Sequence, residues 1–164
     1  MGGLGFFGLI VIAFLAIQVV PYGRDHSNPP VRQEPAWANN QTRELAVRAC
    51  YDCHSNETKW PWYSNIAPIS WLVQRDVDEG RDELNFSRWD QSQGEADDAA
   101  ETVIDGEMPP CFYVLPHPEA DLSRGEKELL IQGLRATFGG EDRGGEDQRG
   151  RREERQRLAQ AKQP

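Results

Sequence analysis

Residues 50–54 read Cys50-Tyr51-Asp52-Cys53-His54, which is the five-residue pattern Cys-x-x-Cys-His. This pattern is typical of the attachment site of c-type haem. Two thiols three residues apart on one helical turn can each form a thioether with a haem vinyl group, and the adjacent histidine then lies under the iron as an axial ligand. The motif therefore predicts one covalently bound haem c, held by Cys50, Cys53 and His54.

Three other interpretations of the motif fit the rest of the chain less well. A thioredoxin-like redox pair belongs near a βαβ pattern, which this sequence lacks. A zinc site needs a second pair of ligands, and the remaining cysteine and histidines have no paired spacing. These residues are Cys111, His26 and His117. A disulfide between Cys50 and Cys53 would close a very tight loop and would leave His54 unexplained.

Met108 is the favoured candidate for the sixth iron ligand, because it is the only methionine beyond the initiator. It is followed by Pro109 and Pro110, and these two prolines would hold the thioether in a loop against the iron. His117 is the rival ligand, and His26 is a more distant one. The alternative role for Met108 is simple filling of core space.

The chain contains five tryptophans, and most of them follow the motif closely. We expect Trp60, Trp62 and Trp71 to form walls of the haem pocket, where indole N–H groups can bond the haem propionates. Ordinary core packing is the alternative, and the two roles overlap. Cys111 comes directly after the Met-Pro-Pro segment, and the sequence assigns it no function.

Helical signals dominate the rest of the chain and predict an all-α fold. Apolar periodicity and capping residues indicate helices at about 40–50, 70–82, 95–104 and 123–138. The last of these begins with Ser123 and Glu126 in the form of a capping box and ends at Gly139-Gly140. No alternating pattern of useful length predicts a strand.

The N-terminal residues Gly2 to Val20 are nineteen uncharged, mainly apolar residues ended by Pro21. At about 1.5 Å rise per residue this run just spans a hydrocarbon core of about 30 Å, so residues 1–20 are predicted to be a transmembrane anchor. A cleaved signal peptide is the rival, although no Lys or Arg precedes Arg24. Covalent haem attachment takes place outside the cytoplasm in bacteria. The domain after the anchor is therefore expected to face the periplasm or the cell exterior.

Composition divides the remainder of the chain into three segments. Residues 21–38 contain four prolines and predict an extended tether. Residues 39–140 are expected to form the haem-binding domain. Residues 141–164 are almost purely Glu, Asp, Arg, Gln and Gly, so we expect a disordered tail.

The formal net charge of the chain is -9. From Glu141 onward there are seven basic and six acidic residues, which leaves 11 basic and 21 acidic residues, a net charge of -10, in the part before it. A nucleic-acid partner is not expected, because it would need a basic face. The acidic surface is consistent either with a basic docking partner or with no special partner.

A longer run supports the motif and resembles a known family. Residues 50–71 read CYDCHSNETKWPWYSNIAPISW, and further similar segments are Gly80-Arg81, Leu84-Asn85-Phe86-Ser87, Trp89, Met108-Pro109-Pro110, Tyr113, His117-Pro118 and Leu122-Ser123. Over about residues 40–138 the chain resembles the bacterial haem-binding domain family of small c-type cytochromes. The resemblance implies a cytochrome c-like helical fold around one haem, with Cys50, Cys53 and His54 as the attachment site. It also implies that Met108 is the distal ligand.

The function expected from these features is one-electron transfer by a monohaem protein near the membrane. Its partners would be redox proteins, including membrane oxidoreductases, and no substrate chemistry is required. The first alternative is a peroxidase-like enzyme, for which His117 is the one candidate acid–base residue. The second alternative is a haem-based sensor or assembly module.

Overall fold

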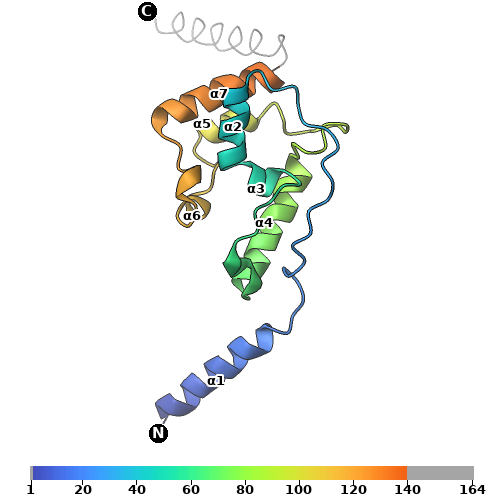
Figure 1. Cartoon of the computed structure of the whole chain (residues 1–164). Coiled ribbons are helices and arrows are strands. Elements are labelled where there is room, and N and C mark those ends of the chain that lie inside the picture. The colour runs from blue at the N-terminus through green and yellow to red at the C-terminus, as the bar shows by residue number, and fades with distance from the viewer. Residues whose placement is uncertain (1, 140–164) are drawn as a thin grey trace, which may run out of the picture.

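The computed structural model of the chain describes residues 2–139, and Figure 1 shows their arrangement. Within this range the chain is helical and contains no strand. The extended pairing present there is an isolated parallel bridge between Gln33 and Arg88. The all-α prediction is therefore confirmed for the described part of the chain.

Seven α-helices and two short 3-10 helices follow one another along residues 2–139. Their bounds are α1 Gly2–Ile17, α2 Asn40–Ala49, α3 Tyr51–His54, η1 Trp62–Asn65, α4 Ile69–Glu83, α5 Ala99–Ile104, α6 Cys111–Val114, η2 Pro118–Ala120 and α7 Arg124–Phe138. The four helices predicted for the domain are α2, α4, α5 and α7. The short helices α3, α6, η1 and η2 lie in segments that carry too few residues to show a helical period.

Side-chain caps explain where two of the predicted helices begin. The Asn39 side chain accepts a hydrogen bond of 2.8 Å from the backbone N–H of Thr42, which starts α2. At α7 the capping box is complete. The Glu126 N–H donates to the Ser123 hydroxyl at 3.3 Å, and the Ser123 N–H donates to the Glu126 carboxylate at 2.8 Å.

Two helix boundaries differ from the prediction. The helix predicted through Cys50 breaks there, because Cys50 has φ -126° and ψ -34° and the chain restarts as α3. The helix predicted from Glu95 begins only at Ala99. The preceding residues form successive turns, and Glu95, Asp97 and Asp98 are exposed, so this stretch has no apolar stripe to bury.

The hydrophobic core lies where α2, α5 and α7 pack together, at the top of the view in Figure 1. Its fully buried side chains include Ala46 and Leu130, at 0% exposure. Phe86 lies at the centre of an aromatic cluster and is 2% exposed. The rings within 6.5 Å of it in this cluster are those of Trp37, Tyr51, His54, Trp89 and Phe138.

Helix α1 stands apart from the domain at the lower end of Figure 1, and its large apolar side chains between Phe6 and Leu15 are exposed. It covers 16 residues, fewer than the nineteen-residue apolar run, because the chain turns at Gln18. The Gln18 amide donates to the carbonyl of Ala67 at 2.9 Å and accepts from its N–H at 3.0 Å. In the described range no helix is both long and apolar enough to cross a membrane, so the predicted transmembrane helix at 1–20 is not supported.

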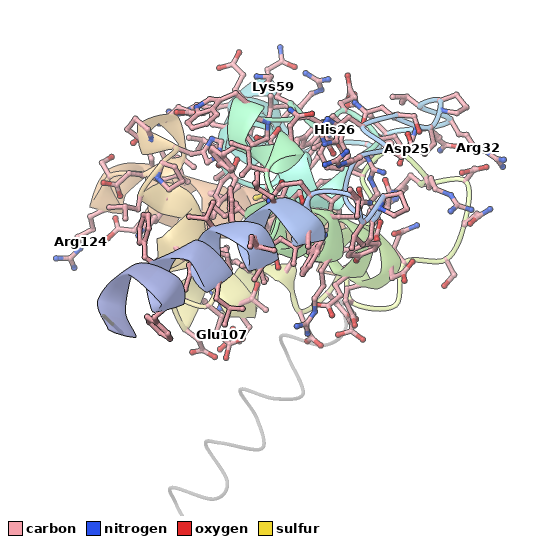
Figure 2. All side chains as sticks on the ribbon, turned by 90° about the horizontal axis from the view of Figure 1, so that it is seen from below. Asp25, His26, Arg32, Lys59, Glu107 and Arg124 are labelled. Carbon is pink, nitrogen blue, oxygen red and sulfur yellow. The ribbon has the colours of Figure 1, made fainter. Side chains whose placement is uncertain are left out.

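Residues 21–38 contain no helix, and they run along the domain rather than away from it (Figure 1). His26 stacks on Trp60 with ring centroids 4.7 Å apart, and the Asn28 amide donates to the Thr58 carbonyl at 2.9 Å. Figure 2 shows Asp25, His26 and Arg32 on the side of the molecule that this segment follows. The tail predicted at 141–164 lies outside the described residues.

Gly133 allows α7 to lie directly on α2. A Cβ atom at this position would overlap the Thr42 side chain, which is itself 2% exposed. We predict that Gly133→Ala lowers the free energy of unfolding by about 1–3 kcal/mol, because the buried contact has no room to relax. Denaturant unfolding followed by circular dichroism measures this change.

Gly125→Ala is the matched control, because it makes the same substitution in the same helix. A Cβ atom at Gly125 would meet no atom within 4 Å. We expect this variant to be as stable as the original chain or slightly more so. Equal unfolding free energies for the two variants would contradict the packing argument.

Candidate functional site

The cysteine motif lies at the junction of two helices. Helix α2 ends at Ala49, and the N–H of Cys50 donates to the Ala46 carbonyl at 2.8 Å. The N–H of His54 then donates to the Cys50 carbonyl at 2.9 Å, which makes residues 50–54 a single helical turn. The turn brings Cys50, Cys53 and His54 to the same cavity.

This cavity has a volume of about 520 Å³, and Met108 also lines it. Its other walls come from α2 (Ala49), α4 (Asp76, Glu79, Gly80, Glu83), the segment between α4 and α5 (Leu84, Phe86, Glu95, Asp98), α5 (Ala99, Thr102, Val103), the α6 region (Pro110, Phe112, Tyr113) and α7 (Leu134). The structure thus brings the favoured sixth ligand from the sequence into the same cavity as the motif. We call it the motif cavity.

The orientation of His54 is fixed by a backbone hydrogen bond. Its Nδ1 lies 3.1 Å from the carbonyl oxygen of Leu84. A carbonyl oxygen only accepts, so the proton is on Nδ1 and the lone pair is on Nε2. Burial lowers the pKa of His54, and the bond to Leu84 opposes this effect in part. The ring is therefore neutral at pH 7 with an Nε2 that is available to a metal.

Cys50 and Cys53 are free thiols in this structure. Burial raises the pKa of each to about 12, with a further contribution from Cys53 at Cys50 and from Asp76 at Cys53. Partly buried thiols with raised pKa values are unlike the low-pKa pair of a thioredoxin-type site. Among residues 2–139, no group of three His, Cys, Asp or Glu residues is placed to hold a metal ion.

Helices α3 and α4 approach each other closely at Gly80. A Cβ atom at this position would lie 2.8 Å from the carbonyl oxygen of Cys53. Arg81, the next residue of α4, donates to the Ser55 carbonyl at 2.8 Å. The backbone of the motif is thereby held against one face of α4.

Met108 follows a tight turn at the end of α5. Gly106 has a φ of +76°, a conformation that favours glycine. The N–H groups of Glu107 and Met108 both donate to the carbonyl of Thr102, at 3.0 and 3.1 Å. The Met108 side chain is partly buried and packs against the core, whereas Glu107 lies at the periphery in Figure 2.

His117 and His26 do not line the motif cavity. The Nε2 of His117 lies 2.7 Å from the Tyr63 hydroxyl, and its Nδ1 lies 3.3 Å from the Glu119 carboxylate. The Nε2 of His26 lies 3.1 Å from the carbonyl of Ser64. Both ring nitrogens of His117 therefore have protein partners, and His26 is held by Ser64 and by stacking on Trp60.

A second cavity of about 690 Å³ lies next to the motif cavity, and we call it the outer cavity. The two share Cys53, Asp76, Phe112 and Tyr113 as lining residues. Several of its other walls are large apolar side chains that are exposed, namely Trp62, Ile69, Leu72 and Leu115. His117 and Tyr63 also line it.

The three tryptophans predicted as pocket walls are not brought to the motif cavity. Trp60 stacks on His26, and the buried Nε1 of Trp71 has no hydrogen-bond partner within residues 2–139. Neither residue lines either cavity, and Trp62 is 77% exposed at the edge of the outer one. The aromatic walls of the motif cavity are Phe86, Phe112 and Tyr113 instead. Cys111 is exposed and lines neither cavity.

The charges around the motif cavity are of one sign. Five carboxylates line it, those of Asp76, Glu79, Glu83, Glu95 and Asp98, and no Lys or Arg of residues 2–139 does. Burial raises the pKa of Asp76, and the neighbouring Glu79 adds to this effect. Residues 76, 79, 80 and 83 follow helical spacing on one face of α4, so the sequence carried a signal for this wall.

Comparisons with known proteins place the chain in a family. No curated protein and no solved structure matches it. The model of the haem-binding domain family matches residues 12–136, which is most of the chain and includes both the motif and Met108. The chain therefore belongs to the haem-binding domain family.

Proposed function

We propose that this chain is a c-type monohaem electron carrier, with haem bound through thioethers at Cys50 and Cys53 and with His54 as an axial ligand. The observation that carries the proposal is that Cys50, Cys53, His54 and Met108 all line one cavity. These are the donor types found at a covalently attached, six-coordinate haem. When bound, the haem supplies reversible one-electron exchange.

The residues of the motif cavity fit such a group. A volume of about 520 Å³ lies within the range of about 300–1,000 Å³ typical of cofactor pockets. The walls nearest the core are apolar, including Leu84, Phe86 and Leu134. His54 presents a neutral ring with a free Nε2, and its Nδ1–H donates a hydrogen bond to the Leu84 carbonyl. This is the usual arrangement of a metal-binding histidine.

Met108, in the loop between α5 and α6, completes the proposed ligand set. Its thioether would favour ferrous iron and raise the reduction potential, whereas the five carboxylates of the cavity wall would favour ferric iron and lower it. With His54 and Met108 both as ligands, the iron would have no open position for a substrate. This supports electron transfer rather than catalysis.

The charge of the chain supports a basic redox partner. The carboxylates that line the motif cavity would attract a cationic surface over a distance of about one Debye length, roughly 8–10 Å at physiological salt. Because c-type haem is attached outside the cytoplasm in bacteria, the proposal includes an extracytoplasmic position. The peroxidase-like alternative gains no support, since His117 does not line the cavity that holds His54 and Met108.

Covalent attachment is tested with the three cysteines. In a host with haem-attachment machinery, the original chain should keep its haem through denaturing electrophoresis. The double variant Cys50→Ala/Cys53→Ala should lose it, because both thioethers are gone. Cys111→Ala is the matched control and should keep the full haem stain, because Cys111 lines neither cavity. A stained band in the double variant would contradict attachment at the motif.

The sixth ligand is tested with Met108→Ala. We expect this variant to keep covalent haem but to lose the weak near-infrared absorption band of sulfur ligation to ferric iron. The measurement is the oxidised spectrum of each purified protein. His117→Ala is the companion variant, and its band should be unchanged. An unchanged band in Met108→Ala, or no band in the original chain, would exclude Met108 and move the ligand assignment to His117.

The acidic wall is tested through the reduction potential. Glu79→Gln and Glu83→Gln each remove one negative charge that favours ferric iron, so each should raise the potential by roughly tens of millivolts at low salt. Glu44→Gln is the control, because Glu44 is exposed on α2 and lines neither cavity. Spectroelectrochemical titration measures all three. An equal shift in the control would mean that only the net charge matters.

A further inference from the structure

The loop that carries Met108 is anchored firmly on its α5 side. Two backbone N–H groups, those of Glu107 and Met108, share the carbonyl of Thr102. The side chain of Val103, in the same helix, is buried in the core. On this side the position of Met108 is therefore tied to the packing of α5 against α7.

The other side of the loop is anchored much less well by packing. Pro109 and Pro110 have no N–H to donate, and no residue of α6 is buried. Phe112 is 63% exposed. Among the helices of residues 2–139, α6 lies against η2 alone. Apolar burial therefore does little to keep residues 109–114 close to the motif.

A partly buried hydrogen bond between Tyr113 and Asp52 anchors this side of the loop. The Tyr113 hydroxyl on α6 donates to Oδ2 of Asp52 at 2.7 Å, and Asp52 stands between the two cysteines of the motif. The other carboxylate oxygen accepts from the N–H of Lys59 at 3.0 Å, and the Asp52 carbonyl accepts from the Thr58 hydroxyl at 2.8 Å. Asp52 is thus held by Thr58 and Lys59 in addition to its bond with Tyr113.

The Tyr113 ring is also held in place. It stacks on the ring of His117 with centroids 4.3 Å apart and an interplanar angle of 14°, and His117 is bonded to Tyr63 on η1. Burial raises the pKa of Tyr113 well above its usual range, and the Asp52 carboxylate adds to this effect. The hydroxyl therefore keeps its proton and remains a donor at any physiological pH.

We propose that the Tyr113–Asp52 hydrogen bond positions Met108, by tying the α6 side of its loop to the turn that carries Cys53 and His54. Tyr113 is then a positioning residue, and the bond sets how easily an outside ligand replaces Met108. This inference rests on the proposed function, because it takes Met108 as the sixth ligand. It adds that Asp52, a residue of the Cys-x-x-Cys-His motif, helps to keep Met108 in place as the iron ligand.

The test compares Tyr113→Phe with the original chain, both as full-length haem proteins. The variant keeps the ring and its stacking on His117 but loses the hydroxyl. We expect it to keep covalent haem and to bind imidazole, a competing iron ligand, about tenfold more tightly, since hydrogen bonds to charged groups are worth this much or more. Titration followed by the near-infrared band and the Soret region gives the dissociation constant.

Tyr22→Phe is the matched control, because Tyr22 is exposed and lines neither cavity. Its imidazole affinity should equal that of the original chain. Asp52→Asn is the second variant, and it should raise the affinity as Tyr113→Phe does, because it removes the charged acceptor. If Tyr113→Phe binds imidazole like the original chain, or takes up no covalent haem, the positioning role is excluded.

Met108→Ala, measured in the same series, separates this inference from the proposed function. If its near-infrared band is unchanged, the ligand assignment itself fails. If the band disappears in Met108→Ala while Tyr113→Phe behaves like the original chain, only the positioning role fails.

Discussion

The close packing of α3 on α4 is the constraint on which the site depends. Gly80 lets the Cys53 carbonyl lie against the α4 backbone, and the chain that leaves α4 then returns past the motif. This return places the Leu84 carbonyl at Nδ1 of His54, and the N–H of Phe86 donates to the His54 carbonyl at 2.8 Å. Gly80 therefore permits the close approach that holds the motif against α4, next to the segment whose backbone bonds both the ring and the carbonyl of His54.

The sequence was sufficient for features that depend on neighbours in the chain. Helices α2, α4 and α7 were predictable because their apolar stripes are local. Helices α2 and α7 also begin with side-chain caps, and the Ser123–Glu126 capping box is complete, whereas α4 has no side-chain cap. The sequence was insufficient for helix boundaries and chain courses that depend on tertiary contacts. The sequence pattern predicts one continuous helix through Cys50, whereas the structure ends α2 at Ala49. Helix α5 starts at Ala99 rather than Glu95, because residues 95–98 have little apolar surface to bury. The course of residues 21–38 depends on contacts such as that of Asn28 with Thr58.

The same division applies to the site. The motif and Met108 could be chosen from the sequence because few residues of the right chemistry exist, and the structure brings them to one cavity. The tryptophans could not be placed, since indole rings suit a core, a surface groove or a cofactor wall equally well. The bond from Tyr113 to Asp52 joins residues 61 positions apart, and nothing local marks either as a partner of the other.

The course of residues 21–38 has a consequence for how the domain can search for other molecules. A free proline-rich linker would let the domain sweep a volume set by the linker's length. Here the segment is held along the domain by Asn28, which bonds Thr58 and accepts from Arg81 at 2.9 Å, and by the ion pair of Glu34 with Arg43 at 2.6 Å. The effective concentration of the motif cavity near α1 is therefore set by these fixed contacts rather than by the length of a free linker.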